Sequence, residues 1–437
     1  MTNSKLAILV GGGPAPGINS VIGAATIRAC LSHTEVLGIQ EGFRWLMQGD
    51  TEHVVPLDIQ TTSRIHFRGG SFIGISRENP TKDARYLDAV LMALMRLGVG
   101  QLITIGGDDT AYSAHRLSEY SAGRLRVVHV PKTIDNDLYL PEGIPTFGFQ
   151  TARHVGVGLL RDLLTDAKTT SRWYFVVTMG RKAGHLALGI GKAAGATITL
   201  IPEEVRMPRI ALAEIVDTLA LAIIKRSSLG RTDGVAVIAE GLVERLDPAE
   251  LEGFGHVERD AHDNLRIAEV SFAELLKARV TQRLQALGLE ATIATKNLGY
   301  ELRCTDPIPY DMEYTRDLGY CAAKYLLEGG ADVMITTVNG VFQPVPLPSL
   351  IDPETGRTRV RLVDINTESY RIARRYMIRL RRDDFEDERE LARLAVTSKL
   401  TIEQFRSQFE YLVRDEPPPL QFVARRNGAA SFPLQPA

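Results

Sequence analysis

Short apolar runs alternate with glycine-containing loops and helical patterns through the first half of the chain. Leu6–Val10, Leu102–Ile105 and Tyr174–Thr178 each lead into such a loop, and a helical pattern follows the loop. Continuous apolar runs that are separated by helices are typical of parallel strands whose two faces are both covered. The pattern therefore predicts an α/β protein built from mainly parallel sheets that helices flank.

Polar loops follow the predicted strands at the ends where ligands bind in open parallel sheets. The first of them leads into a helix predicted near Ser20–Leu31, with Asn19 or Ser20 as its N-cap. This placement predicts a binding site that several strand ends build together. The loops are Gly11–Gly17, Gly106–Thr110, Lys132–Asp137 and Met179–Arg181.

The length of 437 residues indicates two or three domains, because one hydrophobic core rarely extends beyond about 250–300 residues. We expect an N-terminal α/β domain over 1–140 and a second α/β domain over 141–345, with a cleft between them. The chain is expected to cross back between these domains near 300–345. A helical segment and a tail are expected over 346–437. There the basic stretch Arg361–Arg382 and the acidic stretch Asp383–Glu390 predict a solvated helix and its turn.

Composition narrows the class of protein. The 51 Lys and Arg residues against 53 Asp and Glu residues give a net charge of −2, so no basic excess is available to bind nucleic acid. No run of eighteen apolar residues predicts a membrane span. Three cysteines without metal-ligand spacing favour a reducing compartment, and the sequence predicts a cytoplasmic protein.

Two of the loops carry chemistry that suits phosphate and metal binding. Glycines at Gly11–Gly13 let backbone N–H groups approach phosphate oxygens, although such turns also serve tight packing alone. Their spacing matches neither the dinucleotide-binding nor the P-loop motif. Adjacent carboxylates at Asp108 and Asp109 repel each other unless a cation such as Mg²⁺ compensates them. The alternative is that Asp109 caps the next helix.

The other polar positions suit transfer of a charged group. Asp135 can take a proton from a reacting hydroxyl, and Lys132 can neutralise a moving phosphoryl group. A polar loop with Asx-turns is the alternative. Arg77 and Arg181 lie in loops where guanidinium groups make bidentate phosphate contacts, but each also suits a surface salt bridge.

Taken together, these loops resemble the phosphofructokinase family in one continuous order from residue 5 to about 340. This resemblance covers much more of the chain than any single motif. Its carriers are Gly12–Gly13, Ala15–Asn19, Arg68–Arg77, Gly106–Asp108, Thr133–Asp137, Met179–Gly184, Glu240–Gly241 and Leu298–Arg303.

The resemblance implies transfer of a phosphoryl group to the 1-hydroxyl of fructose 6-phosphate. It implies Asp135 as the general base, Asp108 as the Mg²⁺-site carboxylate, and Lys132, Asp109 and Arg181 as further catalytic residues. Arg172 matches a position that the family supplies from a neighbouring subunit, which implies a homo-oligomer. The implied donor-binding residues are Gly12, Gly13, Arg77, Gly107, Asp109 and Lys132, and the implied sugar-phosphate residues are Thr133, Asp135, Asp137, Arg172, Met179, Gly180, Arg181, Glu240, Lys296, Tyr300 and Arg303.

Two substitutions bear on the phosphoryl donor. ATP-dependent members normally carry glycine where this chain has Asp109 and Lys132, and both replacements are similar to the pyrophosphate-dependent branch. The Asp109 carboxylate would crowd and repel the α-phosphate of a nucleotide, which pyrophosphate lacks. Lys132 would stabilise the phosphoryl group without a nucleotide anchor. Pyrophosphate is therefore the expected donor, in a reversible reaction.

Three alternatives remain open at this stage. The chain could be an ATP-dependent enzyme of the same fold, or a non-catalytic regulatory subunit that binds sugar phosphates. The same contacts would also serve another acceptor, such as sedoheptulose 7-phosphate. Among the acceptor positions, Ala294 stands where many members carry an arginine for the 6-phosphate, and Lys296 is the expected substitute.

Overall fold

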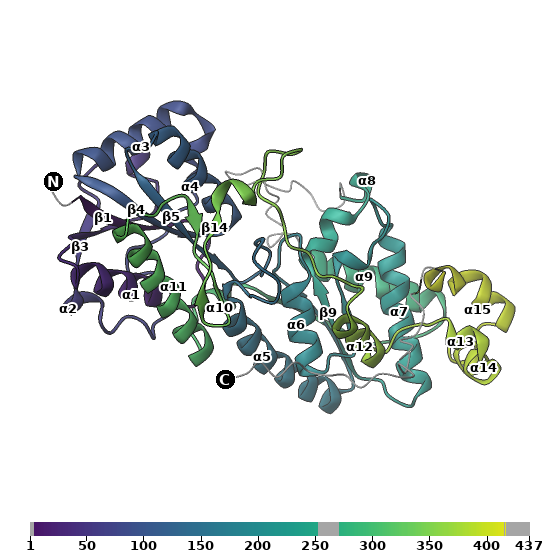
Figure 1. The fold of residues 1–437 in the computed structure, drawn as a ribbon. Coiled ribbons are helices and arrows are strands. Elements are labelled where there is room, and N and C mark those ends of the chain that lie inside the picture. Colours follow the sequence, from purple (N-terminus) through teal and green to yellow (C-terminus); the bar gives the residue numbers. More distant parts are fainter. Residues whose placement is uncertain (1–3, 252–270, 415, 417–437) are drawn as a thin grey trace, which may run out of the picture.

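The computed structural model describes residues 4–251, 271–414 and 416. They form two lobes, each built on one mainly parallel sheet that helices flank (Figure 1). The expected α/β class is confirmed. Within the described residues, no helix combines the length and the apolar composition that crossing a bilayer requires.

The first lobe is built on a sheet of order β14-β11-β5-β4-β1-β2-β3, with β6 paired to β5. Its pairs are parallel except β2 with β3 and β11 with β14. The side chains of β1 alternate between the two faces of the sheet. Leu6 and Ile8 pack toward α1 and α11, whereas Ala7 and Leu9 pack toward α3 and α4. The strands are β1 (Lys5–Val10), β2 (Val36–Ile39), β3 (Val54–Leu57), β4 (Val99–Gly106), β5 (Arg126–Thr133), β6 (Phe147–Gly148), β11 (Val333–Met334) and β14 (Val345–Pro346), and the helices are α1 (Ile18–Cys30), α2 (Ile59–Thr62), α3 (Ala84–Arg96), α4 (Asp108–Ser121) and α11 (Pro309–Leu327).

The second lobe is built on a fully parallel sheet of order β10-β7-β9-β8. Phe175 and Ile238 face the core beneath α7 and α9, whereas Val176 and Val237 face α5 and α6. The strands are β7 (Trp173–Thr178), β8 (Ile198–Leu200), β9 (Gly234–Ala239) and β10 (Ile293–Leu298), and the helices are α5 (Phe149–Thr170), α6 (His185–Ala194), α7 (Leu212–Ser228), α8 (Pro248–Leu251), α9 (Phe272–Ala286) and α10 (Tyr300–Arg303).

Residues 309–346 return to the first lobe. The sequence expectation grouped them with the second domain while allowing for a return; in the structure α11 packs on α1, and β11 pairs with β5. The two helices approach closely because Gly319 has no side chain: a Cβ there would lie 2.5 Å from the Val21 carbonyl oxygen. The hairpin of β12 (Thr337–Val338) and β13 (Val341–Phe342) lies within this return.

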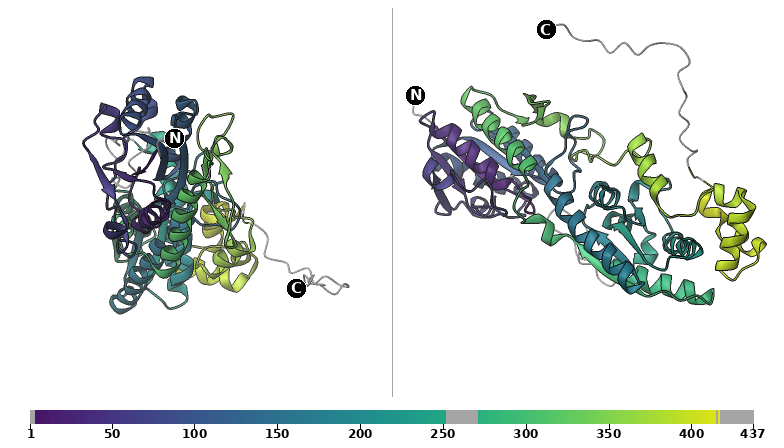
Figure 2. Two further views of the ribbon diagram at one scale, coloured as in Figure 1. Left: turned by 60° about the vertical axis from the view of Figure 1, so that its left-hand side comes forward. Right: turned by 90° about the horizontal axis from the view of Figure 1, so that it is seen from below.

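The C-terminal segment comprises the described residues after β14, which are 347–414 and 416. It crosses from the first lobe to the outer side of the second. Helices α13–α15 lie at the end of the molecule opposite to β1 (Figure 2). Phe385, Leu394 and Phe405 bury their side chains in the core beneath α7. Of the tail expected from Asp415 onward, residues 415 and 417–437 lie outside the described residues. The helices are α12 (Glu368–Tyr376), α13 (Asp383–Glu386), α14 (Glu388–Thr397) and α15 (Ile402–Phe409).

Candidate active site

The strand register brings the polar loops to matching edges of the two sheets. Val10 pairs with Ile105, and Gly106 pairs with Pro131, so the first three loops leave the first sheet side by side. In the second sheet, Thr178 pairs with both Ala239 and Leu298. The loops that follow β7, β9 and β10 therefore also start together.

The first loop turns tightly at Gly12, where φ is +81° and an L-side chain would be strained. The Gly12 N–H donates a hydrogen bond to the Ser76 carbonyl oxygen at 2.9 Å. The helix after this loop begins at Ile18 with Gly17 as its N-cap, so the expected cap at Asn19 or Ser20 is wrong. The Asn19 side chain instead donates to the carbonyl oxygens of Arg68 and Gly69, which ties the two loops together.

Three cationic side chains lie next to this turn, which is called the glycine turn and consists of Gly11–Gly13. Lys132 is 3% exposed, and its ammonium group donates to the Gly13 carbonyl oxygen. A Cβ placed on Gly13 would lie 3.6 Å from the Arg303 guanidinium carbon and 3.7 Å from an Arg77 nitrogen. Burial, together with the nearby charges of Arg303 and Arg181, lowers the pKa of Lys132 to about 7. An anion at this turn would relieve their mutual repulsion.

Arg181 joins the two lobes across the site. Its guanidinium group lies 3.0 Å from an Asp108 oxygen and 3.5 Å from an Asp109 oxygen. Both carboxylates lie in the first turn of α4, and the N-cap is Gly107, so Asp109 does not cap this helix. The two aspartates and Arg181 compensate one another's charges across the lobes.

The loop after β5 buries three polar side chains that the sequence singled out. Thr133, Asp135 and Asp137 are each less than a tenth exposed. The Asp135 N–H donates to the Thr133 hydroxyl at 3.0 Å, but within the described residues the buried Oδ1 atom of Asp135 accepts no hydrogen bond. Burial and the carboxylates of Asp135 and Asp108 raise the pKa of Asp137. A proton donor or a cation at this loop would therefore be bound favourably.

Glu240 follows β9 and fixes the loop after β7. Its Oε1 atom accepts hydrogen bonds from the backbone N–H groups of Gly180 at 3.0 Å and Arg181 at 2.9 Å. These two hydrogen bonds support an unusual backbone conformation, because Arg181 has a φ of +48°, which is uncommon for a residue other than glycine. Burial raises the pKa of Glu240 to about 7. Met179 precedes this loop and is also buried; it packs against Gly299, where a Cβ would lie 2.6 Å from its sulfur atom.

The loop after β10 brings Tyr300 and Arg303 to the same place. The Arg303 guanidinium group lies over the Tyr300 ring, 5.2 Å from its centre, and also close to Gly13 as described above. Lys296 is an exposed residue of β10, and its ammonium group pairs with Glu301 at 3.4 Å. No contact in the described structure joins Lys296 to the glycine turn or to the loop after β5.

Arg172 lies far from these groups along its own chain. It precedes β7, whereas Met179 follows that strand, so the two residues mark opposite ends of it. The Arg172 side chain pairs with Asp166 at a distance of 4.0 Å. A single chain therefore does not bring Arg172 to the site.

Sequence reasoning missed Arg361, which contacts the loop after β5. Its backbone N–H donates to the Asp137 carbonyl oxygen at 2.7 Å, and its guanidinium group donates to the Asn136 and Ile144 carbonyl oxygens. Nearby, the Thr358 hydroxyl donates to the Asp108 carbonyl oxygen at 3.2 Å. Only the clustering of basic residues after Thr358 signalled this segment, and that pattern predicted a solvated helix.

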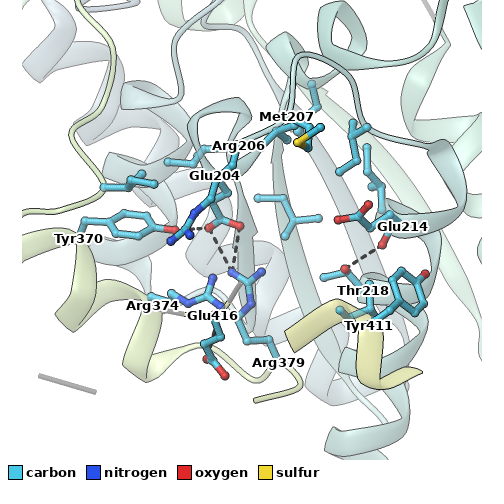
Figure 3. Close-up of a pocket in the computed structure, with 18 of the residues that line it drawn as sticks. Glu204, Arg206, Met207, Glu214, Thr218, Tyr370, Arg374, Arg379, Tyr411 and Glu416 are labelled. Atoms are coloured by element: carbon cyan, nitrogen blue, oxygen red, sulfur yellow. Dashed lines mark hydrogen bonds and ion pairs between the residues drawn. The ribbon is translucent and has the colours of Figure 1, made fainter. Parts of the chain in front are cut away.

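A pocket away from these loops lies under the C-terminal segment, on the outer side of the second lobe (Figure 3). Arg379 pairs with Glu204 at 3.0 Å inside it, and the Tyr370 hydroxyl donates to the same carboxylate at 2.5 Å. Arg374 pairs with Glu416 at 3.4 Å. The expectation of a solvated basic helix is therefore wrong for these arginines, since their side chains anchor the segment to the lobe.

Comparisons with known proteins identify the family of the chain. The family model described as phosphofructokinase matches residues 5–326. A pyrophosphate–fructose 6-phosphate 1-phosphotransferase of Thermotoga maritima is 50% identical over 93% of this chain and 98% of that relative. One of the same name from Naegleria fowleri is 49% identical over 94% of this chain and 96% of the relative.

The fold agrees with this match. The crystal structure of a pyrophosphate-dependent phosphofructokinase from Marinobacter aquaeolei superimposes with a TM-score of 0.62 at 19% identity, and it covers 84% of this chain and 88% of the other. At that identity the likeness supports the fold alone. From the family model and the two close relatives, the chain belongs to the phosphofructokinase family.

Proposed function

We propose that this protein reversibly transfers a phosphoryl group from pyrophosphate to the 1-hydroxyl of fructose 6-phosphate. The observation that carries the proposal is the buried Lys132 ammonium group, which contacts the glycine turn together with Arg77 and Arg303. Three cations at one turn suit a compact, highly charged donor that has no base or sugar to anchor it. The names of the two relatives that are 50% and 49% identical to this chain support the same donor and acceptor.

The proposed chemistry is direct in-line transfer. Asp135 accepts the proton of the 1-hydroxyl as the bond to phosphorus forms, and Thr133 and Asp137 hold the acceptor beside it. Lys132 and Arg181 stabilise the charge on the transferring group, and Gly12, Gly13, Gly107 and Arg77 surround the donor. No covalent intermediate is required.

The sugar phosphate is proposed to bind between the loops of the second lobe. Glu240 and the Met179–Arg181 loop hold the sugar hydroxyls, and Arg303 with Tyr300 holds the 6-phosphate. Lys296 pairs with Glu301 and would have to leave that carboxylate to reach the phosphate.

Mg²⁺ is the proposed metal, with Asp108 as its protein ligand and Asp109 beside it. Within the described residues, no group of three or more His, Cys, Asp or Glu side chains could hold a metal alone. This fits Mg²⁺, which proteins often bind through one or two carboxylates together with substrate phosphates. When bound, the ion would neutralise charge on the donor phosphates.

A homo-oligomer is proposed because Arg172 lies at the wrong end of β7 to serve its own site. In this proposal Arg172 of a second copy reaches the sugar phosphate. Sedimentation at assay concentration tests it, and a fully active monomer would contradict it.

The cysteines at Cys30, Cys304 and Cys321 are free thiols, which supports a cytoplasmic location that cell fractionation can check.

One assay tests the proposed function. Fructose 6-phosphate is supplied with pyrophosphate or with ATP, each with Mg²⁺ and with a chelator in its place. Turnover is expected with pyrophosphate and Mg²⁺ only. Turnover with ATP alone would contradict the donor, and no turnover with either would favour another acceptor, such as sedoheptulose 7-phosphate, or a non-catalytic subunit.

Replacing Asp109 with glycine is expected to raise kcat/KM for ATP by about tenfold or more, because one repulsive carboxylate near the α-phosphate disappears. Asp109→Asn is the matched variant, since it removes the charge and keeps the bulk. A gain in both variants identifies repulsion, and a gain in the glycine variant alone identifies crowding. An unchanged donor preference in both would show that Asp109 does not select the donor.

A further inference from the structure

The C-terminal segment contacts the loop after β5 through a β-bridge and several hydrogen bonds. Val360 forms an antiparallel bridge with Leu138, which directly follows that loop. The Arg361 backbone N–H then donates to the Asp137 carbonyl oxygen at 2.7 Å. Its guanidinium group donates through Nε to the Asn136 carbonyl oxygen at 3.1 Å, and through Nη1 to the Ile144 carbonyl oxygen at 2.6 Å.

The loop needs such a restraint at Asn136. This residue stands between Asp135 and Asp137 and has a φ of +58°, a left-handed conformation that costs free energy in an L-residue. Its Oδ1 atom accepts hydrogen bonds from the Thr146 N–H at 3.0 Å and from the Arg361 guanidinium group. Arg361 therefore binds both the backbone and the side chain of the strained residue.

The segment that carries Arg361 is itself fixed to the second lobe. The Arg361 carbonyl oxygen accepts a hydrogen bond from His185 at 3.1 Å, and the Val363 N–H donates to Glu203 at 2.9 Å. Further along, Tyr370 and Arg379 hold the segment on Glu204 (Figure 3). The Arg361 guanidinium group therefore belongs to a segment that is fixed to the second lobe, and its hydrogen bonds restrict the movement of the loop after β5.

We propose that Arg361 is a positioning residue of the phosphoryl transfer. It holds Asn136 in the left-handed turn, and so fixes the direction in which Asp135 and Asp137 present their carboxylates. Arg361 itself binds carbonyl oxygens and an amide, so it has no part in the chemistry. This inference rests on the proposed function, because it takes Asp135 as the group that receives the proton.

Kinetics of Arg361→Met test the proposal against a matched neighbour. Misplacing a catalytic group by about 1 Å can cost about 10²-fold, so kcat is expected to fall by about 10–10²-fold. The KM for pyrophosphate should change less than about threefold, because Arg361 does not contact the glycine turn or Lys132. Arg359→Gln is the control: this exposed arginine of the same segment stacks 5.6 Å from the Tyr139 ring and should keep wild-type kcat.

Hydrogen exchange provides a readout that needs no activity. Amides of residues 133–146 should exchange about tenfold faster or more in Arg361→Met than in wild type, and the rest of the described chain should not. Arg359→Gln should leave them unchanged, except next to Tyr139, on whose ring Arg359 stacks. If the wild-type chain transfers no phosphoryl group, the proposed function fails, whereas unchanged exchange in Arg361→Met overturns the restraint itself.

Arg361→Lys tests the proposed positioning role if the methionine variant does not fold. One ammonium group cannot reproduce three guanidinium hydrogen bonds, so kcat should still fall severalfold at an unchanged melting temperature. Wild-type kcat in this variant would overturn the proposal. An equal loss in Arg361→Met and Arg359→Gln would also overturn it, since it would indicate general damage to the segment.

Discussion

Asp135→Asn is expected to lower kcat by about 10²–10⁴-fold, the usual scale for loss of a general base. The Oδ1 atom of Asp135 is buried and accepts no hydrogen bond within the described residues, so it is available to the acceptor hydroxyl. An asparagine keeps the shape of the side chain and cannot take the proton. The KM values of both substrates should therefore change little, and steady-state kinetics in both directions would measure the loss.

The control for this experiment is Asp88→Asn, which removes an exposed carboxylate on α3. It should leave kcat unchanged, and the melting temperatures of both variants should stay near that of the wild type. A kcat within tenfold of wild type in well-folded Asp135→Asn would show that another group receives the proton. Asp137 would then be the next candidate, because it is buried in the same loop, two residues from Asp135.

Lys132→Met is expected to lower kcat with pyrophosphate by about 10²–10³-fold, the scale for removing one preorganised charge from a transition state. The ammonium group is almost fully buried beside Gly12 and Gly13, where little water would replace it. Methionine fills a similar volume without the charge. Lys192→Met is the matched control and should leave kcat unchanged, since this lysine is exposed and its ammonium group donates to Ser369 alone among the described residues.

The pH dependence gives the same residue a second test. Burial lowers the pKa of Lys132 to about 7, so its charge is present below that pH and is lost as the pH rises through it. Because kcat/KM reports groups of the free enzyme, kcat/KM for pyrophosphate should fall about tenfold per pH unit above the pKa. Bound pyrophosphate raises this pKa, so kcat should fall only at higher pH. An alkaline limb that persists unchanged in Lys132→Met would assign it to another group.

Much of the fold could be predicted from the sequence because local patterns determine it. Apolar runs such as Leu102–Ile105 must be buried on two faces, and this requirement alone specifies parallel strands between helices. The order of the polar loops also identified the family, since a binding site at strand ends depends on chain order. The candidates Asp135, Lys132 and Arg303 came from the same resemblance.

The way in which these residues act on one another depends on tertiary contacts. Arg181 pairs with Asp108 and Asp109 because two sheets come together, and no local pattern encodes that contact. Burial lowers the pKa of Lys132, and so does the nearby charge of Arg303, which lies 171 positions further along the chain. The expected cap at Asn19 was wrong because this side chain bonds to a distant loop instead.

The role of Arg361 shows where sequence reasoning stops. A basic stretch reads as a solvated surface, because in isolation each arginine is best placed in water. Here the backbone carbonyl groups of a strained turn at Asn136 offer hydrogen bonds that replace that hydration. The strands, the order of the loops and the chemical groups that the loops carry follow from local sequence patterns. Which charges are buried, paired or held in place follows from the folded chain, because those properties depend on contacts between residues that are remote in the sequence.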